Sequence, residues 1–138
     1  MRARVQWKRG AELADAQLDE RGMPVGWPMH EGVEIGPGRV KQLVDAGEDV
    51  TLLDCRLPKE KDIAQIEGSV FIPMQELGDR VDELDDFLDR KLVVFCHAGM
   101  RSMKVAMFLK ERGFEDVWSM AGGIDLWSQA IDGAVPRY

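Results

Sequence analysis

The stretch CHAGMRS, residues 96–102, brings together residue types that suit the chemistry of a nucleophilic sulfur. An apolar run ends at Cys96, a glycine follows three positions later, and Arg101 and Ser102 then open a segment with helical character. A junction of strand, turn and helix points several backbone N–H groups and the positive end of the helix dipole at one place, where a thiolate is stabilised. We call residues 96–102 the cysteine loop and expect Cys96 to act as its nucleophile.

The other residues of the cysteine loop each fit a task in holding an anionic sulfur. Gly99 allows a tight turn, Arg101 adds a fixed positive charge, and Ser102 either caps the helix or donates to the sulfur. His97 is expected at the rim, because adjacent side chains point in different directions. The alternative is that Cys96 is only a small buried hydrophobe at the end of a core strand.

Alternating strands and helices are expected to position this loop. Apolar segments predict strands at VTLLD, VFI, LVVFC and DVWSM. Helical spacing predicts helices near residues 37–46, across QELGDRVDELDDFL, from about 101 to 112 and from about 123. Nearly continuous apolar strands separated by helices indicate an α/β fold, with a central parallel sheet and helices on both faces. Ligands of such sheets bind beyond the carboxyl ends of the strands, which is where Cys96 stands.

The N-terminal part of the chain differs from the rest. KRGAELADAQLDERG is compatible with a short charged helix, whereas MPVGWPMHEGVEIGPG is rich in Gly and Pro and reads as an extended arm over the domain. Trp27 is expected to anchor that arm. We therefore expect an N-terminal extension over residues 1–31 and one domain over residues 32–138.

Composition narrows the classes of function. A chain of 138 residues that is 45% hydrophobic and 31% charged fits one globular domain, and its net charge of -7 argues against nucleic acid or a membrane as partner. No apolar run has the length of a membrane span or signal peptide, so we expect a cytoplasmic protein. The two cysteines and two histidines form neither a disulfide scaffold nor a zinc spacing, so no metal is expected.

Three motifs resemble the rhodanese family, sulfurtransferases that carry sulfur as a cysteine persulfide. CHAGMRS resembles the family's active-site loop, LLDCRLPKEKDIAQIEGSVFIPM its Asp-Val-Arg turn and following strand, and GFEDVWSMAGGIDLW its C-terminal signature. The resemblance covers about residues 32–138. The tail AGGIDLWSQAIDGAVPRY, with IPMQELGDRVDEL, further resembles the rhodanese domain fused to adenylylating enzymes that feed sulfur to molybdopterin and thiamine carriers.

The resemblance implies a rhodanese-like fold and a double displacement that needs no cofactor. Thiosulfate or a persulfide-bearing protein gives its sulfane sulfur to Cys96, and a thiophilic acceptor such as cyanide, a thiol or a sulfur-carrier protein removes it. Asp54 and Arg56 are implied to support the loop from beneath and to hold Arg101. Four residues separate Cys96 from Arg101, the shorter loop of the sulfurtransferases rather than the longer one of related phosphatases and arsenate reductases.

Five positions depart from the family's pattern. Gln65 stands where the family usually has His and Glu67 where it often has Pro, in a stretch that is structural in the family, so little effect on the chemistry is expected. Ala98 and Met100 are neutral where rhodaneses that use thiosulfate well often carry a cation, so thiosulfate is expected to be a poor donor. Met100 either makes the rim apolar for docking or serves as a packing residue. Cys55 either replaces a buried apolar residue or acts as a resolving thiol toward Cys96. A noncatalytic rhodanese-like interaction module is the alternative function, although such modules typically lose the loop cysteine.

Overall fold

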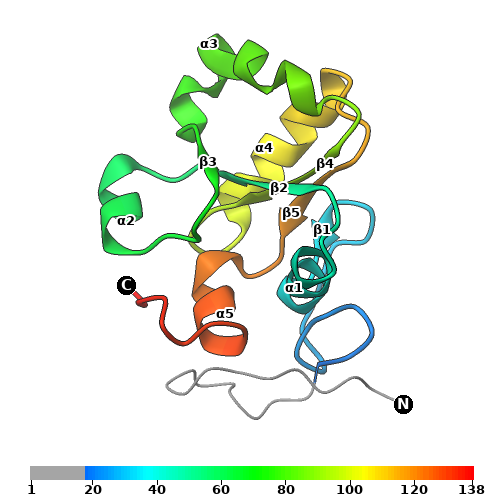
Figure 1. Ribbon diagram of the computed structural model, residues 1–138, viewed down its shortest axis with the longest axis vertical. Coiled ribbons are helices and arrows are strands. Elements are labelled where there is room, and N and C mark those ends of the chain that lie inside the picture. Colours follow the sequence, from blue (N-terminus) through cyan, green and yellow to red (C-terminus); the bar gives the residue numbers. More distant parts are fainter. Residues whose placement is uncertain (1–17) are drawn as a thin grey trace.

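Five parallel strands form the central sheet, in the order β1-β5-β4-β2-β3 (Figure 1). This computed structural model describes residues 18–138. The strands are β1 (Glu34–Ile35), β2 (Val50–Asp54), β3 (Val70–Phe71), β4 (Lys91–Phe95) and β5 (Val117–Met120). Most residues of the three middle strands are apolar and buried, as expected of a parallel sheet covered on both faces. The predicted α/β class is confirmed.

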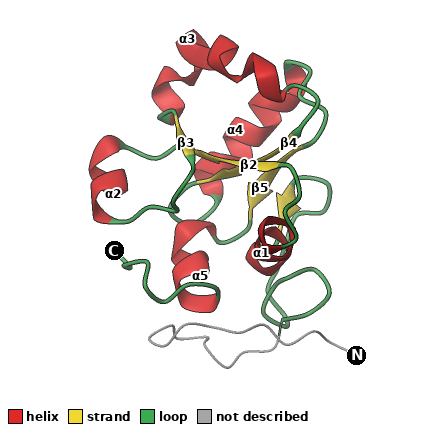
Figure 2. Cartoon of the chain, viewed as in Figure 1, coloured by secondary structure: helices red, strands yellow, loops and turns green. Residues whose placement is uncertain are grey.

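Helices cover both faces of this sheet (Figure 2). They are α1 (Pro37–Asp45), α2 (Pro58–Ile63), α3 (Leu77–Arg80), α4 (Met100–Glu111) and α5 (Gly123–Ala130), with 3-10 helices η1 (Met74–Glu76) and η2 (Val81–Phe87) flanking α3. In Figure 1, α1 and α5 lie on one side of the sheet, and α3 and α4 on the other. Two apolar cores result, one between α1, α5 and the sheet, the other between α3, α4 and the sheet.

The predicted helix across QELGDRVDELDDFL is broken into three short pieces rather than continuous. Helical spacing had predicted a buried face of Leu77, Val81, Leu84 and Leu88. Leu77 and Leu84 are buried in one core and Val81 packs against it, but Leu88 is exposed, so the prediction is correct only for the first three. Two elements had not been expected. These are the two-residue strand β1 and the six-residue helix α2, which are too short to show a clear period.

The N-terminal segment packs differently from the prediction. Trp27 is 38% exposed, so the expectation that it anchors the arm is wrong. Leu18 and Met23 are buried in the core instead, and the Gly22 carbonyl accepts a hydrogen bond from Gly38 N. The predicted charged helix lies largely in residues 1–17, outside the described part of the chain, and residues 18–22 form a bridge and a turn.

The register of β2 and β4 brings the two cysteines to one edge of the sheet. Asp54 pairs with Phe95, and each is followed by a cysteine, Cys55 and Cys96. Both thiols therefore stand at the carboxyl ends of adjacent parallel strands, where this fold class places its ligands. Within residues 18–138, no helix is long and apolar enough to cross a membrane, and no cluster of three or more His, Cys, Asp or Glu is placed to hold a metal ion.

Candidate active site

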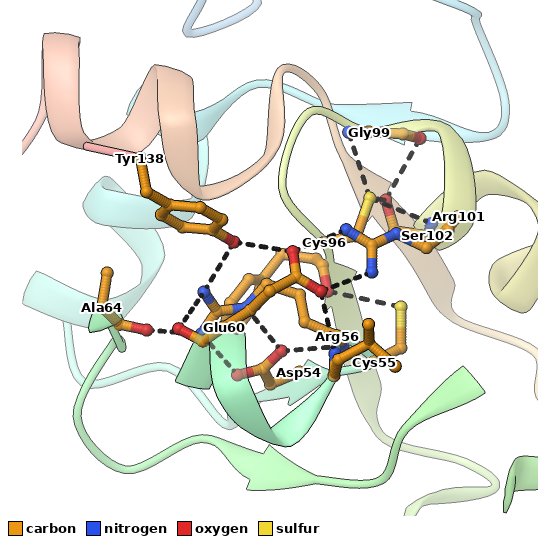
Figure 3. Close-up of polar contacts among 12 residues, drawn as sticks. Asp54, Cys55, Arg56, Glu60, Ala64, Cys96, Gly99, Arg101, Ser102 and Tyr138 are labelled. Carbon is orange, nitrogen blue, oxygen red and sulfur yellow. Dashed lines mark hydrogen bonds and ion pairs between the residues drawn. The ribbon is translucent and has the colours of Figure 1, made fainter. Parts of the chain in front are cut away.

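The Cys96 sulfur lies inside a ring of hydrogen-bond donors formed by the cysteine loop (Figure 3). Gly99 N donates to Sγ at 3.1 Å and Ser102 N donates to it at 3.4 Å. Cys96 is only 1% exposed, so these amides act where water does not compete for them. Two N–H donors at the first turn of α4 are an arrangement that stabilises a sulfur carrying negative charge.

Gly99 makes this ring possible by its conformation. It is the N-cap of α4 and has φ 111° and ψ -9°, a region in which side chains are strained. A Cβ at this position would also lie 3.3 Å from Gly122 N. The expected role of Gly99 as the turn that folds the backbone around the sulfur agrees with this geometry.

A second helix fixes the backbone of the loop from the other side. Ile124 N, at the start of α5, donates to the Cys96 carbonyl at 2.9 Å, and Asp125 N donates to the His97 carbonyl at 3.0 Å. The free N–H groups at the beginning of α5 thus bind the first two carbonyls of the loop. From the sequence, the segment AGGIDLW stood out only for its family resemblance, and its contact with the cysteine loop was not predicted.

Ser102 belongs to a buried pair of hydroxyls beneath the sulfur. Its Oγ lies 3.4 Å from Cys96 Sγ, 2.7 Å from Ser119 Oγ and 3.2 Å from the Gly99 carbonyl. Gly99, not Ser102, occupies the N-cap, so the capping role is wrong. The hydroxyl does contact the sulfur, but the Cys96 thiol donates to Ser102 Oγ, which itself donates to the Gly99 carbonyl. Ser119 comes from β5 and had not been predicted, because nothing in DVWSM marks a serine for a distant loop.

Arg101 points at a carboxylate of α2 rather than standing free beside the sulfur. Its Nη1 lies 2.7 Å from Glu60 Oε2 and its Nη2 lies 2.9 Å from Glu60 Oε1, a two-pronged ion pair. No hydrogen bond joins Arg101 to Cys96 within the part of the chain that the structure describes. The charge of Arg101 therefore acts near the sulfur while its donors are bound to Glu60.

Glu60 is held by two further donors and was missed by the sequence reasoning. Leu57 N donates to Oε2 at 3.0 Å, and the Tyr138 hydroxyl donates to Oε1 at 2.9 Å. The hydrogen bonds from Arg101, followed by the smaller contribution of these two donors, lower the pKa of Glu60 to about 2 despite its burial. A signal was present, since Glu three residues into a helix that begins with Pro58 commonly accepts from the N-cap amide.

Asp54 and Arg56 form a buried ion pair beneath Glu60 and Tyr138. Arg56 is fully buried and binds Asp54 through Nε at 2.9 Å and Nη2 at 2.8 Å. Its Nη1 also donates to the Tyr138 hydroxyl at 3.0 Å and to the Glu60 carbonyl at 3.2 Å. The expected support of Arg101 is therefore indirect, because it passes through Tyr138 and Glu60.

The rim of the loop is neutral and open. Ala98 is exposed, and the Met100 side chain is 76% exposed, so Met100 is not a packing residue. The His97 ring packs against the Tyr138 ring with centroids 4.3 Å apart, and its buried Nδ1 has no hydrogen-bond partner in residues 18–138. His97 thus lies beside the site, as expected of a rim residue.

Cys55 occupies the equivalent strand end without any amide ring. It is 1% exposed, and its Sγ donates to the Phe95 carbonyl at 3.4 Å. Burial, with a smaller contribution from Cys96, raises the pKa of the Cys55 thiol far above its ordinary value. These features favour the interpretation of Cys55 as a buried replacement for an apolar residue.

Comparison with known proteins agrees with the motifs. The family described as Rhodanese-like domain matches residues 36–130. The putative sulfurtransferase YtwF of Bacillus subtilis is 34% identical over 94 residues, covering 68% of this chain and 88% of YtwF. The probable adenylyltransferase/sulfurtransferase MoeZ of Mycobacterium tuberculosis is 31% identical over 110 residues, covering 78% of this chain and 28% of MoeZ.

A solved structure shares the fold. The crystal structure of a rhodanese-related protein from Thermoplasma volcanium has a TM-score of 0.62 and 29% identity, covering 69% of this chain and 89% of that one. The chain spans only 28% to 31% of the length of the longer curated relatives that it matches. Family, relatives and fold support sulfur transfer as the general chemistry of the domain. The chain belongs to the rhodanese-like family.

Proposed function

We propose that the protein is a sulfurtransferase that carries sulfane sulfur as a persulfide on Cys96. The donor is thiosulfate or a persulfide-bearing protein, and the acceptor is a thiophilic group such as cyanide, a thiol or a sulfur-carrier protein. The single observation that carries this proposal is the pair of amides, Gly99 N and Ser102 N, that donate to the buried Cys96 sulfur. The similarity to a relative that is named a putative sulfurtransferase supports the proposal.

In the first half-reaction the Cys96 thiolate attacks the sulfane sulfur of the donor. A bond forms between the two sulfurs while the bond inside the donor breaks, so thiosulfate leaves as sulfite and a persulfide donor leaves as its thiolate. Because the attacking group is anionic, the two amides and the dipole of α4 stabilise its negative charge. The Ser102 hydroxyl, which contacts both the sulfur and Ser119 Oγ, can accept from a thiol or donate to a thiolate.

In the second half-reaction the acceptor attacks the outer sulfur of the persulfide. The bond between the two sulfurs breaks, and Cys96 leaves as a thiolate, which returns the protein to its starting state. The same two amides stabilise this leaving group. Binding of the loop backbone by the start of α5 keeps the two amide donors in place during both steps.

Intact-mass spectrometry tests the proposal. The full chain is incubated with thiosulfate, or with a cysteine desulfurase and cysteine, and we expect a gain of one sulfur atom that cyanide removes as thiocyanate. Cys96→Ser is the comparison variant and should gain nothing. If the wild type gains no sulfur from either donor, the proposal is wrong and the noncatalytic interaction module becomes the better interpretation.

A further inference from the structure

The Arg101 guanidinium is already occupied by a carboxylate of the same chain. The two-pronged contact with Glu60, at 2.7 and 2.9 Å, uses one edge of the guanidinium, which is the geometry in which arginine binds carboxylates and other oxyanions. The Arg101 side chain is 30% exposed and that of Glu60 is 11% exposed. An incoming oxyanion therefore meets an arginine whose charge is largely neutralised.

Glu60 is not free to turn away from Arg101. Its carboxylate also accepts from Leu57 N and from the Tyr138 hydroxyl, at 3.0 and 2.9 Å. Tyr138 in turn accepts from Arg56, which is fully buried. Figure 3 shows the Glu60 carboxylate between the Tyr138 hydroxyl and the Arg101 guanidinium. Release of Arg101 thus requires several charge-assisted hydrogen bonds to break together.

The loop offers no second cation to replace Arg101. Residues 97–102 are His-Ala-Gly-Met-Arg-Ser, so Arg101 is the only lysine or arginine in this stretch. A second carboxylate also lies close by, since Glu34 Oε2 is 3.8 Å from the position that a Cβ on Gly99 would take. Glu34 thus adds negative charge near the loop, and its Oε1 accepts from His30 N at 2.8 Å.

From this geometry we infer that Glu60 is a specificity-determining residue, which withholds Arg101 from dianionic donors and makes the site selective for persulfides of thiols or proteins. The inference rests on the proposed function and names the donor class of that same site. A persulfide donor transfers its outer sulfur to the Cys96 thiolate and leaves as a thiolate. Its sulfane sulfur carries no sulfonate group, so the reaction does not depend on a free guanidinium. Thiosulfate carries two negative charges, so its binding does depend on a free guanidinium.

The Glu60→Gln variant tests this role with the full chain. Glutamine retains the size of the side chain and one acceptor oxygen, which can serve either Leu57 N or the Tyr138 hydroxyl, and it removes the negative charge that neutralises Arg101. We expect the KM for thiosulfate, with cyanide as acceptor, to fall about tenfold, as a gain of roughly 1.4 kcal/mol in binding a dianion gives. The ratio of kcat/KM for thiosulfate to that for cysteine persulfide should rise by a similar factor. Glu67→Gln is the matched control, because Glu67 is an exposed carboxylate just beyond α2.

Tyr138→Phe is a second variant that keeps the ring packed against His97 and removes only the hydroxyl. With one anchor of Glu60 gone, the same donor ratio should rise by a smaller factor, about two- to threefold, and this variant decides the matter if Glu60→Gln does not fold. An unchanged or lowered ratio in the folded variants overturns the inference, while sulfur uptake by Cys96 leaves the proposed function intact. Absence of sulfur on wild-type Cys96 from every donor overturns both.

Discussion

The ends of β2 and β4 place a cysteine at equivalent positions but offer its sulfur different hydrogen bonds. Cys55 and Cys96 follow paired residues of adjacent parallel strands, and both are 1% exposed. The Cys96 sulfur accepts from two amides, whereas the Cys55 thiol donates to a carbonyl. Strand position and burial are therefore not what distinguishes the two sulfurs. The turn and helix that follow Cys96 supply N–H groups that stabilise negative charge on a sulfur, whereas the other strand end supplies an acceptor.

The arginines that follow the two cysteines differ in the same instructive way. Arg56 is fully buried and paired with Asp54, only two positions away. Arg101 is partly exposed and paired with Glu60, 41 positions away, on a different element. The Arg56–Asp54 pair is local and structural. The Arg101–Glu60 pair lies at the entrance of the site, where its net charge affects which donors bind.

Exchanging each thiol for a hydroxyl gives the largest expected contrast. Cys96→Ser should lower sulfur transfer by at least about 1,000-fold, because a serine hydroxyl is a far weaker nucleophile toward sulfur. Cys55→Ser should leave transfer near the wild-type rate, since its buried thiol takes no part. Thiocyanate formation under matched conditions measures both. If the two variants lose activity equally, Cys55 is a resolving thiol or partner, and the contrast between the strand ends fails.

Adding a methyl group to Gly99 should damage the amide ring itself. At φ 111°, an alanine costs about 1–2 kcal/mol of stability, and its Cβ presses on Gly122 N, so transfer should fall by about tenfold or more. Gly113→Ala is the matched control, because Gly113 has φ 96° and open space around it. Urea unfolding should show a similar loss of stability in both variants. Measured transfer rates should fall in Gly99→Ala alone. Equal loss of activity in both would assign the effect to strain.

Acid should remove the contribution that the Glu60–Arg101 ion pair makes to the free energy of unfolding. Hydrogen bonds from Arg101 lower the pKa of Glu60 from its ordinary 4.5 to about 2 in the folded state. A carboxyl with a lowered folded pKa stabilises the fold above its unfolded pKa and loses that contribution as the pH falls through the folded pKa.

The free energy of unfolding of the wild type should therefore exceed that of Glu60→Gln above pH 4.5. The difference between the two should shrink steadily toward pH 2. Urea titrations at a series of pH values measure it. A difference that stays constant across this window would mean that the Glu60 charge does not stabilise the fold through Arg101.

A lysine at Ala98 should have the smallest effect. Ala98 is exposed, so a new charge there is screened, and we expect the KM for thiosulfate to fall only about two- to fivefold and to rise again with salt. Ala46→Lys adds the same charge beyond α1, as a control. No gain for Ala98→Lys over this control, together with thiosulfate as the faster wild-type donor, would contradict the expectation that the neutral rim makes thiosulfate a poor donor.

Sequence reasoning predicted the parts of the site that are local in the chain. The strand VTLLD and the helix starting near Arg101 were found because apolar runs and helical spacing are strong signals. The donors on the Cys96 sulfur come from within six positions of it, so a turn followed by a helix was sufficient to predict them.

The contacts that cross the fold were beyond that reasoning. Glu60 lies in PKEKDI, a charged segment too short for a clear helical period, and nothing in those letters points to Arg101. Tyr138 contacts Arg56 from 82 positions away, and Ser119 on β5 contacts Ser102 on α4. Such pairs follow from sheet order and crossover geometry, which periodicity does not specify.

The most direct test of the account locates the transferred sulfur on one of the two cysteines. The full chain is loaded from a cysteine desulfurase and cysteine, its persulfides are trapped by alkylation, and the peptides carrying Cys55 and Cys96 are separated by mass spectrometry. We expect the additional sulfur on the Cys96 peptide and none on the Cys55 peptide. Sulfur on Cys55, or equal labelling of both peptides, would contradict the claim that the amides of the cysteine loop select the sulfur carrier.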